Sequence, residues 1–121
     1  MSELIDKKAI TLLISQLGLA MVTEVVEAFV PDAQQNVLFL QTHWQMDQGK
    51  ALRIKSHSLK SSSANIGFKQ LSSLAKKLEE CCLSNSEHEF NKHREELDEL
   101  SQVLEASINE LALMGLAQRK L

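Results

Sequence analysis

The sequence predicts an all-α protein, an antiparallel four-helix bundle with additional N-terminal helices. The first observation is composition: 44% of the 121 residues are hydrophobic, 4% are aromatic, and there are one proline and four glycines. This balance favours helices over strands. The second observation is spacing. Apolar residues recur three and four positions apart, which gives each long segment one apolar stripe and one polar face, as a bundle requires. We find no internal repeat or linker and expect one domain over residues 1–121.

Breaks in the apolar spacing divide the chain into six expected helices. They cover about residues 4–17, 19–29, 31–46, 50–65, 68–83 and 87–114. The last four would form the bundle, because each carries a long apolar stripe. The first two would cap or extend it.

The first three helices are bounded by recognisable end signals. Ser2 or Asp6 can cap the first helix, and Gly18 breaks it. Pro31 has no backbone N–H, so it fits the first turn of a new helix or a kink in a continuing one. Gly49 is expected to end the third helix in the left-handed conformation.

The other three helices follow with short connections. Gly67 supplies the turn after the fourth helix, and so short a turn forces the fourth and fifth helices into an antiparallel hairpin. Ser86 and Glu89 stand at capping-box spacing at the start of the last helix. The tail beyond Gly115 is expected to fray. The expected apolar stripes of these two helices are Phe68, Leu71, Leu74, Ala75, Leu78 and Cys82, then Phe90, Leu97, Leu100, Leu104, Ile108 and Leu111.

Charge is unevenly distributed along the chain. Residues 51–78 contain six Lys or Arg and no acid, whereas residues 79–110 contain ten acids against two bases. Most of these charges fit solvated helix faces, but the basic segment also suits an anionic partner. The net charge of −3 argues against bulk attraction to nucleic acid. No apolar run approaches the ~20 residues of a membrane span, so we expect no membrane insertion.

Cysteines and most histidines give no sign of a metal or redox site. Cys81 and Cys82 are neighbours, and a bridge between neighbours is strained, so we expect a reducing cytoplasm. His43 fits an ordinary surface position, and His88 and His93 fall on different helix faces. The spacing suits neither a zinc site nor a di-metal carboxylate bundle. We therefore expect no metal and no cofactor bound by this domain.

His57 is the candidate reactive residue. Lys60 and Ser61 follow at i+3 and i+4, so the three share one solvated face of the expected fourth helix. An imidazole nitrogen is a competent nucleophile near neutral pH, and a lysine one turn away can offset the charge of a phosphoryl group. A lone exposed histidine usually has no function. The surrounding lysine and small residues make this one a candidate phosphoryl acceptor that another protein can reach.

Glu79 is the best candidate to orient that imidazole. An acceptor for the Nδ1 proton would fix the tautomer and leave Nε2 free to attack. Glu79 lies at the border of the fifth helix's apolar stripe, and the hairpin can bring that border beside His57. From spacing alone, a solvated helix charge is the favoured interpretation of Glu79.

The segment from His57 to Ser63 continues through Gly67 and ends with Leu71, Leu74, Leu78 and Glu79. It resembles the histidine-containing phosphotransfer (HPt) domain family, whose pattern is roughly His-x-Leu-Lys-Gly-Ser-Ser, a nearby Gly and a helix ending in Leu-Glu. A weaker likeness extends upstream through Leu17-Gly18 and Phe29.

The resemblance implies a four-helix bundle that carries a phosphoryl group on one histidine. Carried over by position, His57 is the phosphoacceptor, Lys60 neutralises the phosphate, and Gly67 is the turn between helices. Glu79 stands where the family places a Gln or Glu bonded to the ring. Ser61 departs from the pattern, because the family usually has Gly there, and this leaves the preference for particular regulators open.

The resemblance further implies a phosphoryl carrier, not an enzyme, that works with aspartates of response-regulator receiver domains and a hybrid sensor kinase. The chain has no Gly-rich phosphate loop, so we expect no ATP site, and Mg²⁺ would be held by the receiver. We expect a monomer, and the start at Met1 favours a free-standing relay protein over the C-terminal domain of a kinase. The alternative is an interaction module that binds receiver-like partners without phosphorylation. The expected docking face consists of Arg53, Ile54, Ser61, Ala64, Lys69 and Lys76.

Overall fold

The computed structural model describes residues 3–116, and all regular structure within this range is helical. The all-α prediction is therefore confirmed. Short 3-10 turns, Met46–Gln48 and Arg94–Glu96, precede two of the helices. The helices are α1 (Lys7–Leu17), α2 (Leu19–Thr42), α3 (Gly49–Asn65), α4 (Lys69–Cys82), α5 (Glu87–Phe90) and α6 (Leu97–Leu113).

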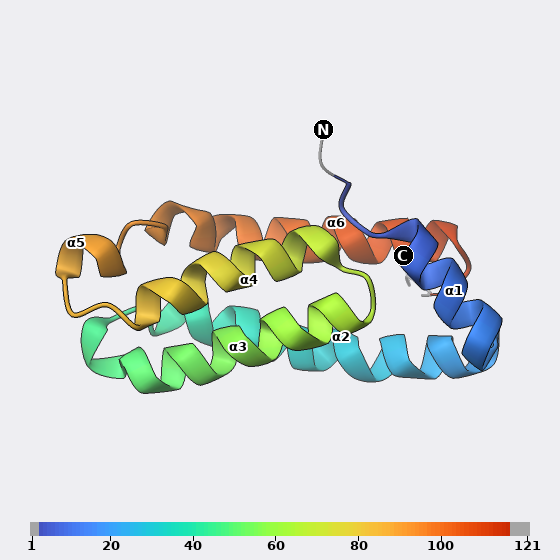
Figure 1. Ribbon diagram of the computed structural model, residues 1–121, viewed down its shortest axis with the longest axis horizontal. Helices are drawn as coiled ribbons and strands as arrows, with labels where there is room; N and C mark the ends of the chain where they lie inside the picture. The colour runs from blue at the N-terminus through green and yellow to red at the C-terminus, as the bar shows by residue number, and fades with distance from the viewer. Residues whose placement is uncertain (1–2, 117–121) are drawn as a thin grey trace.

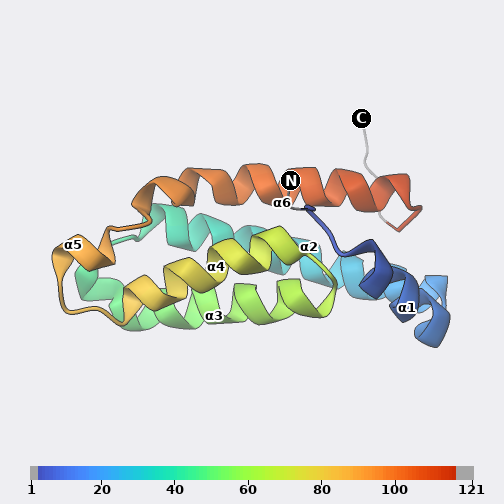
Figure 2. The same ribbon diagram turned by 45° about the horizontal axis from the view of Figure 1, so that its top comes forward.

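Four of these helices, α2, α3, α4 and α6, run along the long axis and form the bundle (Figure 1). The pair α3 and α4 lies side by side as the predicted hairpin, and the turned view shows α2 and α6 completing the bundle behind it (Figure 2). Helix α1 lies against the start of α2 at one end, and α5 lies at the other end. Among the described residues, no helix is both long enough and apolar enough to cross a membrane.

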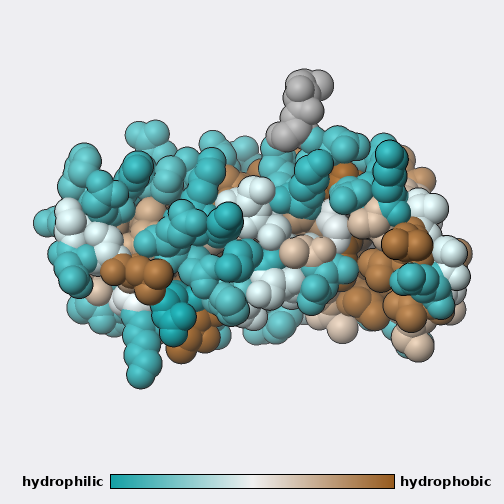
Figure 3. Space-filling view, viewed as in Figure 1, coloured by the Kyte–Doolittle hydropathy of each residue, from teal (hydrophilic) through white to brown (hydrophobic). Residues whose placement is uncertain are grey.

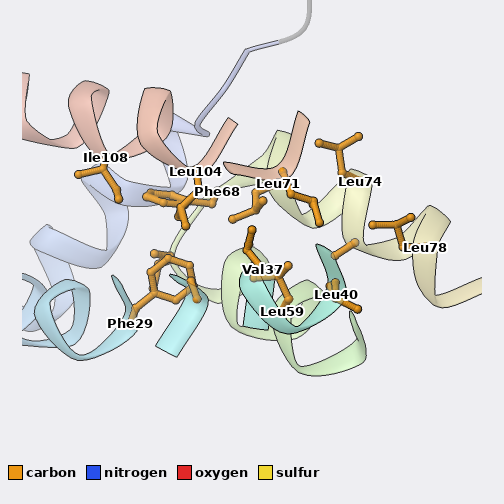
Figure 4. Close-up of a cluster of buried hydrophobic side chains, with 14 of the residues drawn as sticks. Phe29, Val37, Leu40, Leu59, Phe68, Leu71, Leu74, Leu78, Leu104 and Ile108 are labelled. Carbon is orange, nitrogen blue, oxygen red and sulfur yellow. The ribbon is translucent and has the colours of Figure 1, made fainter. Parts of the chain in front are cut away.

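The core is filled by side chains from all four bundle helices (Figure 4). The predicted stripes of the fifth and sixth helices are buried, with one exception: Cys81, at 5% exposure, takes the core position that was expected for Cys82. Phe29 of α2 packs edge-to-face on Phe68 at a centroid distance of 5.1 Å. Burial of this apolar surface is the main stabilising term, at about 25 cal/mol per Å².

Helix α2 corrects the prediction of separate helices over residues 19–29 and 31–46. It runs without interruption from Leu19 to Thr42 with Pro31 inside it, which is the continuing helix of the two alternatives. The reason is packing: Val26, Phe29 and Ala33 keep one buried stripe across the proline. Tertiary contacts along that stripe outweigh the hydrogen bond that proline cannot donate.

The connection from α2 to α3 also differs from the prediction. Gly49 has φ −51° and is the first residue of α3, so it is not a left-handed terminus. The 3-10 turn Met46–Gln48 already reverses the chain and leads directly into α3, which leaves no position that requires positive φ.

The expected last helix, residues 87–114, is three elements in the structure. The chain forms α5, a 3-10 turn at Arg94–Glu96 and then α6. Trp44 explains the interruption, because its ring stacks on Phe90 at 4.8 Å and its carbonyl accepts a hydrogen bond from Arg94 at 3.3 Å. These contacts hold α5 across the end of the bundle, out of line with α6.

Several predicted helix ends are confirmed. Asp6 caps α1 by accepting a hydrogen bond from the backbone N–H of Ala9 at 3.1 Å. Ser86 caps α5 by accepting from the N–H of Glu89 at 3.4 Å. The alternative cap Ser2 lies outside the described residues, as does most of the tail expected to fray after Gly115, residues 117–121.

Candidate functional site: an outward histidine held by a carboxylate

His57 lies in the middle of α3 and faces solvent, as the helical spacing predicts. Its side chain is 56% exposed. Leu52, Ser56 and Leu59 of the same helix are fully buried, because they form the opposite stripe that packs into the core. The imidazole is therefore presented outward from a fixed backbone, where a second protein can reach it.

Glu79 of α4 holds the ring of His57. The Nδ1 atom of His57 lies 2.6 Å from Oε2 of Glu79. An ionised carboxylate can only accept hydrogen bonds, so Nδ1 carries the proton and the lone pair is on Nε2. The hairpin thus brings together two residues 22 positions apart in the sequence, in the geometry predicted for an oriented nucleophile.

Lys60 meets the same carboxylate. Its Nζ lies 2.6 Å from Oε1 of Glu79, so each carboxylate oxygen has one partner. The spacing of Lys60 on the face of His57 predicts a cation beside the imidazole, but nothing in the sequence shows that Glu79 binds both. The side chains of Lys60 and Glu79 are 30% and 15% exposed, which shields this ion pair from water more than a surface pair.

The electrostatics keep Glu79 ionised. Burial acts to raise the pKa of the Glu79 carboxyl, but the hydrogen bonds and charges of Lys60 and His57 outweigh it. The pKa of Glu79 therefore lies below its ordinary value of 4.5. At neutral pH the group is a carboxylate that accepts hydrogen bonds, as the assigned tautomer of His57 requires.

The α3–α4 hairpin positions these residues through contacts at its turn and along its length. Gly67 adopts φ +82°, and its carbonyl accepts a hydrogen bond from the N–H of Asp6 at 2.8 Å. A Cβ atom at Gly67 would lie 2.9 Å from Cγ1 of Ile10, so α1 packs directly on the turn. Beside the site, the hydroxyl of Ser72 donates to the carbonyl of Lys60 at 2.9 Å and ties α4 to α3.

The six residues expected on a docking face are all exposed, but they do not form one cluster. Arg53, Ile54, Ser61 and Ala64 follow the solvated face of α3 on either side of His57. Lys76 lies on α4, one turn before Glu79. Lys69 is apart, because it opens α4 about 15 Å along the helix from Glu79 and pairs with Glu3 at 3.7 Å. An open hollow that the sequence did not reveal adjoins Ile54, lined by Asp47, Gln48, Lys50, Ala51 and Ile54.

Two of the other described histidines, His43 and His93, differ from His57. His43 stacks on Phe39 at 4.4 Å at the end of α2, as an ordinary surface residue can. His93 does pair with a carboxylate, Glu96, at 2.9 Å, but its side chain is only 27% exposed. Within residues 3–116, no three His, Cys, Asp or Glu side chains are grouped so that they could hold a metal ion.

The arrangement of helices agrees with a comparison to protein families. The family model of the Hpt domain matches residues 24–112, which include nearly all of the four bundle helices. The chain belongs to the Hpt domain family. No curated protein and no solved structure was found to match it. Hpt domains are phosphocarriers that act in phosphorelays and interact with response-regulator receiver domains, so this chain has a phosphotransfer role. Helix α1, which packs on the Gly67 turn, lies outside the matched segment.

Proposed function

We propose that the domain accepts a phosphoryl group on Nε2 of His57 and transfers it to or from an aspartate of receiver domains. One observation carries this proposal. The side chain is 56% exposed while its Nδ1 donates to Glu79 at 2.6 Å, which leaves Nε2 of an exposed ring available for reaction.

Phosphoryl transfer depends mainly on the alignment of the reacting groups and on stabilisation of charge. It needs little covalent chemistry from the protein itself. The lone pair of Nε2 attacks the phosphorus of an aspartyl phosphate, the N–P bond forms, and the P–O bond to the aspartate breaks. The bonding electron pair leaves with the aspartate carboxylate. The proton on Nδ1 stays between the ring and Glu79, and the phosphorylated ring becomes a cation. Transfer to a second receiver reverses the same steps.

We expect the partners to bind the exposed surface around His57. We expect a receiver to contribute the Mg²⁺ and acidic pocket, and this domain to contribute Lys60 and the exposed face of Arg53, Ile54 and Ser61. A hybrid sensor kinase is the expected source of the phosphoryl group. We expect the domain to act as a monomer in the cytoplasm, where the two free thiols of Cys81 and Cys82 would stay reduced.

Labelling by a charged receiver tests the proposal. A receiver charged with acetyl phosphate is incubated with the domain and Mg²⁺, and acid-labile, alkali-stable label on the domain is measured. We expect label on the wild type and none on His57→Gln. His93→Gln is the matched control, because His93 also donates to a carboxylate, yet it should label normally.

Two results would contradict the proposal that this domain carries a phosphoryl group on His57. Label that persists in His57→Gln would place the reactive group elsewhere. Binding to receivers without any label on the wild type would instead support the interaction module.

A further inference from the structure

In the resting site Glu79 accepts hydrogen bonds from both His57 and Lys60. Phosphorylation of His57 would add a second anion that competes with Glu79 for Lys60. Oε2 of Glu79 accepts from Nδ1 of His57 and its Oε1 from Nζ of Lys60, both at 2.6 Å. Lys60, the only cation in contact with this carboxylate within the described residues, is thus occupied before any phosphoryl group arrives. We propose that Lys60 changes partner during the reaction, from Glu79 in the resting state to the phosphoryl group on His57. This inference rests on the proposed function.

The charges favour such an exchange. In the resting site the Glu79 carboxylate accepts from one cation, Lys60, and from the Nδ1–H of His57, whose Nε2 must be unprotonated to attack. Phosphorylation at Nε2 leaves the proton on Nδ1, so the ring becomes a cation that is hydrogen-bonded to Glu79. The carboxylate then has a charged partner without Lys60. The phosphoryl group brings a charge of about −2 and three acceptor oxygens, and Lys60 lies one turn from His57 on the same face of α3.

The exchange requires only a side-chain movement. The backbone of Lys60 is fixed, because its carbonyl accepts from the Ser72 hydroxyl at 2.9 Å. Its side chain is 30% exposed and has four rotatable carbon–carbon bonds, so the ammonium group can swing across the face of α3. His57 and Lys60 are spaced i, i+3, which places their Cβ atoms about 5–6 Å apart.

Glu79 therefore acts as a positioning residue in two ways. It fixes the ring of His57, and it competes with the phosphoryl group for Lys60. The competition lowers the net stabilisation that Lys60 gives to phosphohistidine. A less stabilised phosphohistidine transfers its phosphoryl group more readily, as a phosphoryl carrier requires.

A titration of the resting protein tests the first half of the inference. The pKa of Glu79 is followed by ¹³C NMR of its carboxyl carbon in the wild type, in Lys60→Met and in Lys76→Met. Lys76 is the matched control, since it is an exposed cation on the same helix, one turn from Glu79. We expect the pKa to rise in Lys60→Met and to stay unchanged in Lys76→Met. No rise in Lys60→Met would overturn the inference.

A double-mutant cycle on the transfer equilibrium tests the second half. Glu79→Gln keeps an oxygen acceptor for Nδ1 but no charge to hold Lys60. We expect Lys60→Met to lower the equilibrium constant for phosphoryl transfer to His57 at least about threefold more in the Glu79→Gln background than in the wild-type background. An equal loss in both backgrounds, or a smaller loss with Glu79→Gln, would overturn the exchange.

The outcomes separate this inference from the proposed function. If the wild type takes label and the cycle shows no coupling, the carrier function stands and the exchange of Lys60 is wrong. If the wild type takes no label from any receiver, the proposed function fails and the exchange fails with it, whatever the titration shows.

Discussion

At the scale of single residues, the site depends on one carboxylate with two close partners. Glu79 is only 15% exposed, and both partners donate to its ionised form. Removing the charge of Glu79 therefore affects the ring of His57 and the position of Lys60 together. This coupling separates the site from the exposed ion pairs elsewhere on the surface, such as Lys69 with Glu3, which contribute little to stability.

The lowered pKa of Glu79 predicts a pH-dependent contribution to stability. A carboxyl whose pKa is lower in the folded state stabilises the fold above its unfolded pKa, and the contribution is lost as pH falls through the folded pKa. The free energy of unfolding of wild type should exceed that of Glu79→Gln near neutral pH. This difference should shrink as pH falls below 4.5, the ordinary value.

Urea unfolding at several pH values, followed by circular dichroism, measures this difference. Glu80→Gln is the matched control, because Glu80 is exposed and makes neither contact. A difference between wild type and Glu79→Gln that stays constant down to low pH would show that the two hydrogen bonds do not favour the ionised carboxylate in solution.

At the scale of elements, the α3–α4 hairpin sets the distance between His57 and Glu79. Its turn depends on Gly67, which combines φ +82° with a close approach to Ile10 of α1. The hairpin is the element that brings the site together, and α1 is the element that packs on its turn. Damage to the turn should therefore affect both stability and the His57–Glu79 contact.

Gly67→Ala should cost about 1–3 kcal/mol more in unfolding free energy than Gly115→Ala. Both glycines have φ near +80°, but a Cβ at Gly115 would meet nothing within 4 Å, whereas one at Gly67 would lie 2.9 Å from Ile10. The difference between the two variants thus isolates the contact with α1. Chemical denaturation of both variants measures it, and equal costs would show that α1 does not pack tightly on the turn.

The hairpin and its site were predictable because their signals are local or periodic. Gly67 marks the turn, and the i, i+3 spacing of His57 and Lys60 fixes their common face. The continuity of α2 through Pro31 and the break before α6 were not predictable. Both depend on contacts between distant residues, namely the buried stripe of α2 and the stacking of Trp44 on Phe90. The double role of Glu79 depends equally on side-chain geometry across the hairpin.

At the scale of the whole molecule, two kinds of surface are separated. Exposed apolar side chains gather at the α1 end, where Figure 3 shows a brown area, and they include Leu12, Leu17, Leu19, Met21 and Val25. The face around His57 carries Arg53 beside the exposed apolar side chain of Ile54. The whole chain has a net charge of −3, which would repel an acidic receiver pocket. Attraction of such a pocket must therefore come from the local charges around His57.

Arg53→Glu should therefore slow transfer from a charged receiver about tenfold at low salt, with a smaller effect at high salt. Lys8→Glu changes the net charge by the same amount on α1, away from His57, and should leave the rate nearly unchanged. Rapid-quench measurement of label at two salt concentrations compares the variants. Equal slowing by both would mean that net charge, not the face around His57, governs association.

The most direct test of the central claim is the identity of the phosphorylated atom. The domain is labelled with ¹⁵N-histidine, phosphorylated by a charged receiver and examined by ¹⁵N NMR for coupling to ³¹P. Nδ1 of His57 is occupied by Glu79 at 2.6 Å, so the account predicts coupling at Nε2 of His57 alone. Coupling at Nδ1 of His57, or at any other histidine, would contradict it.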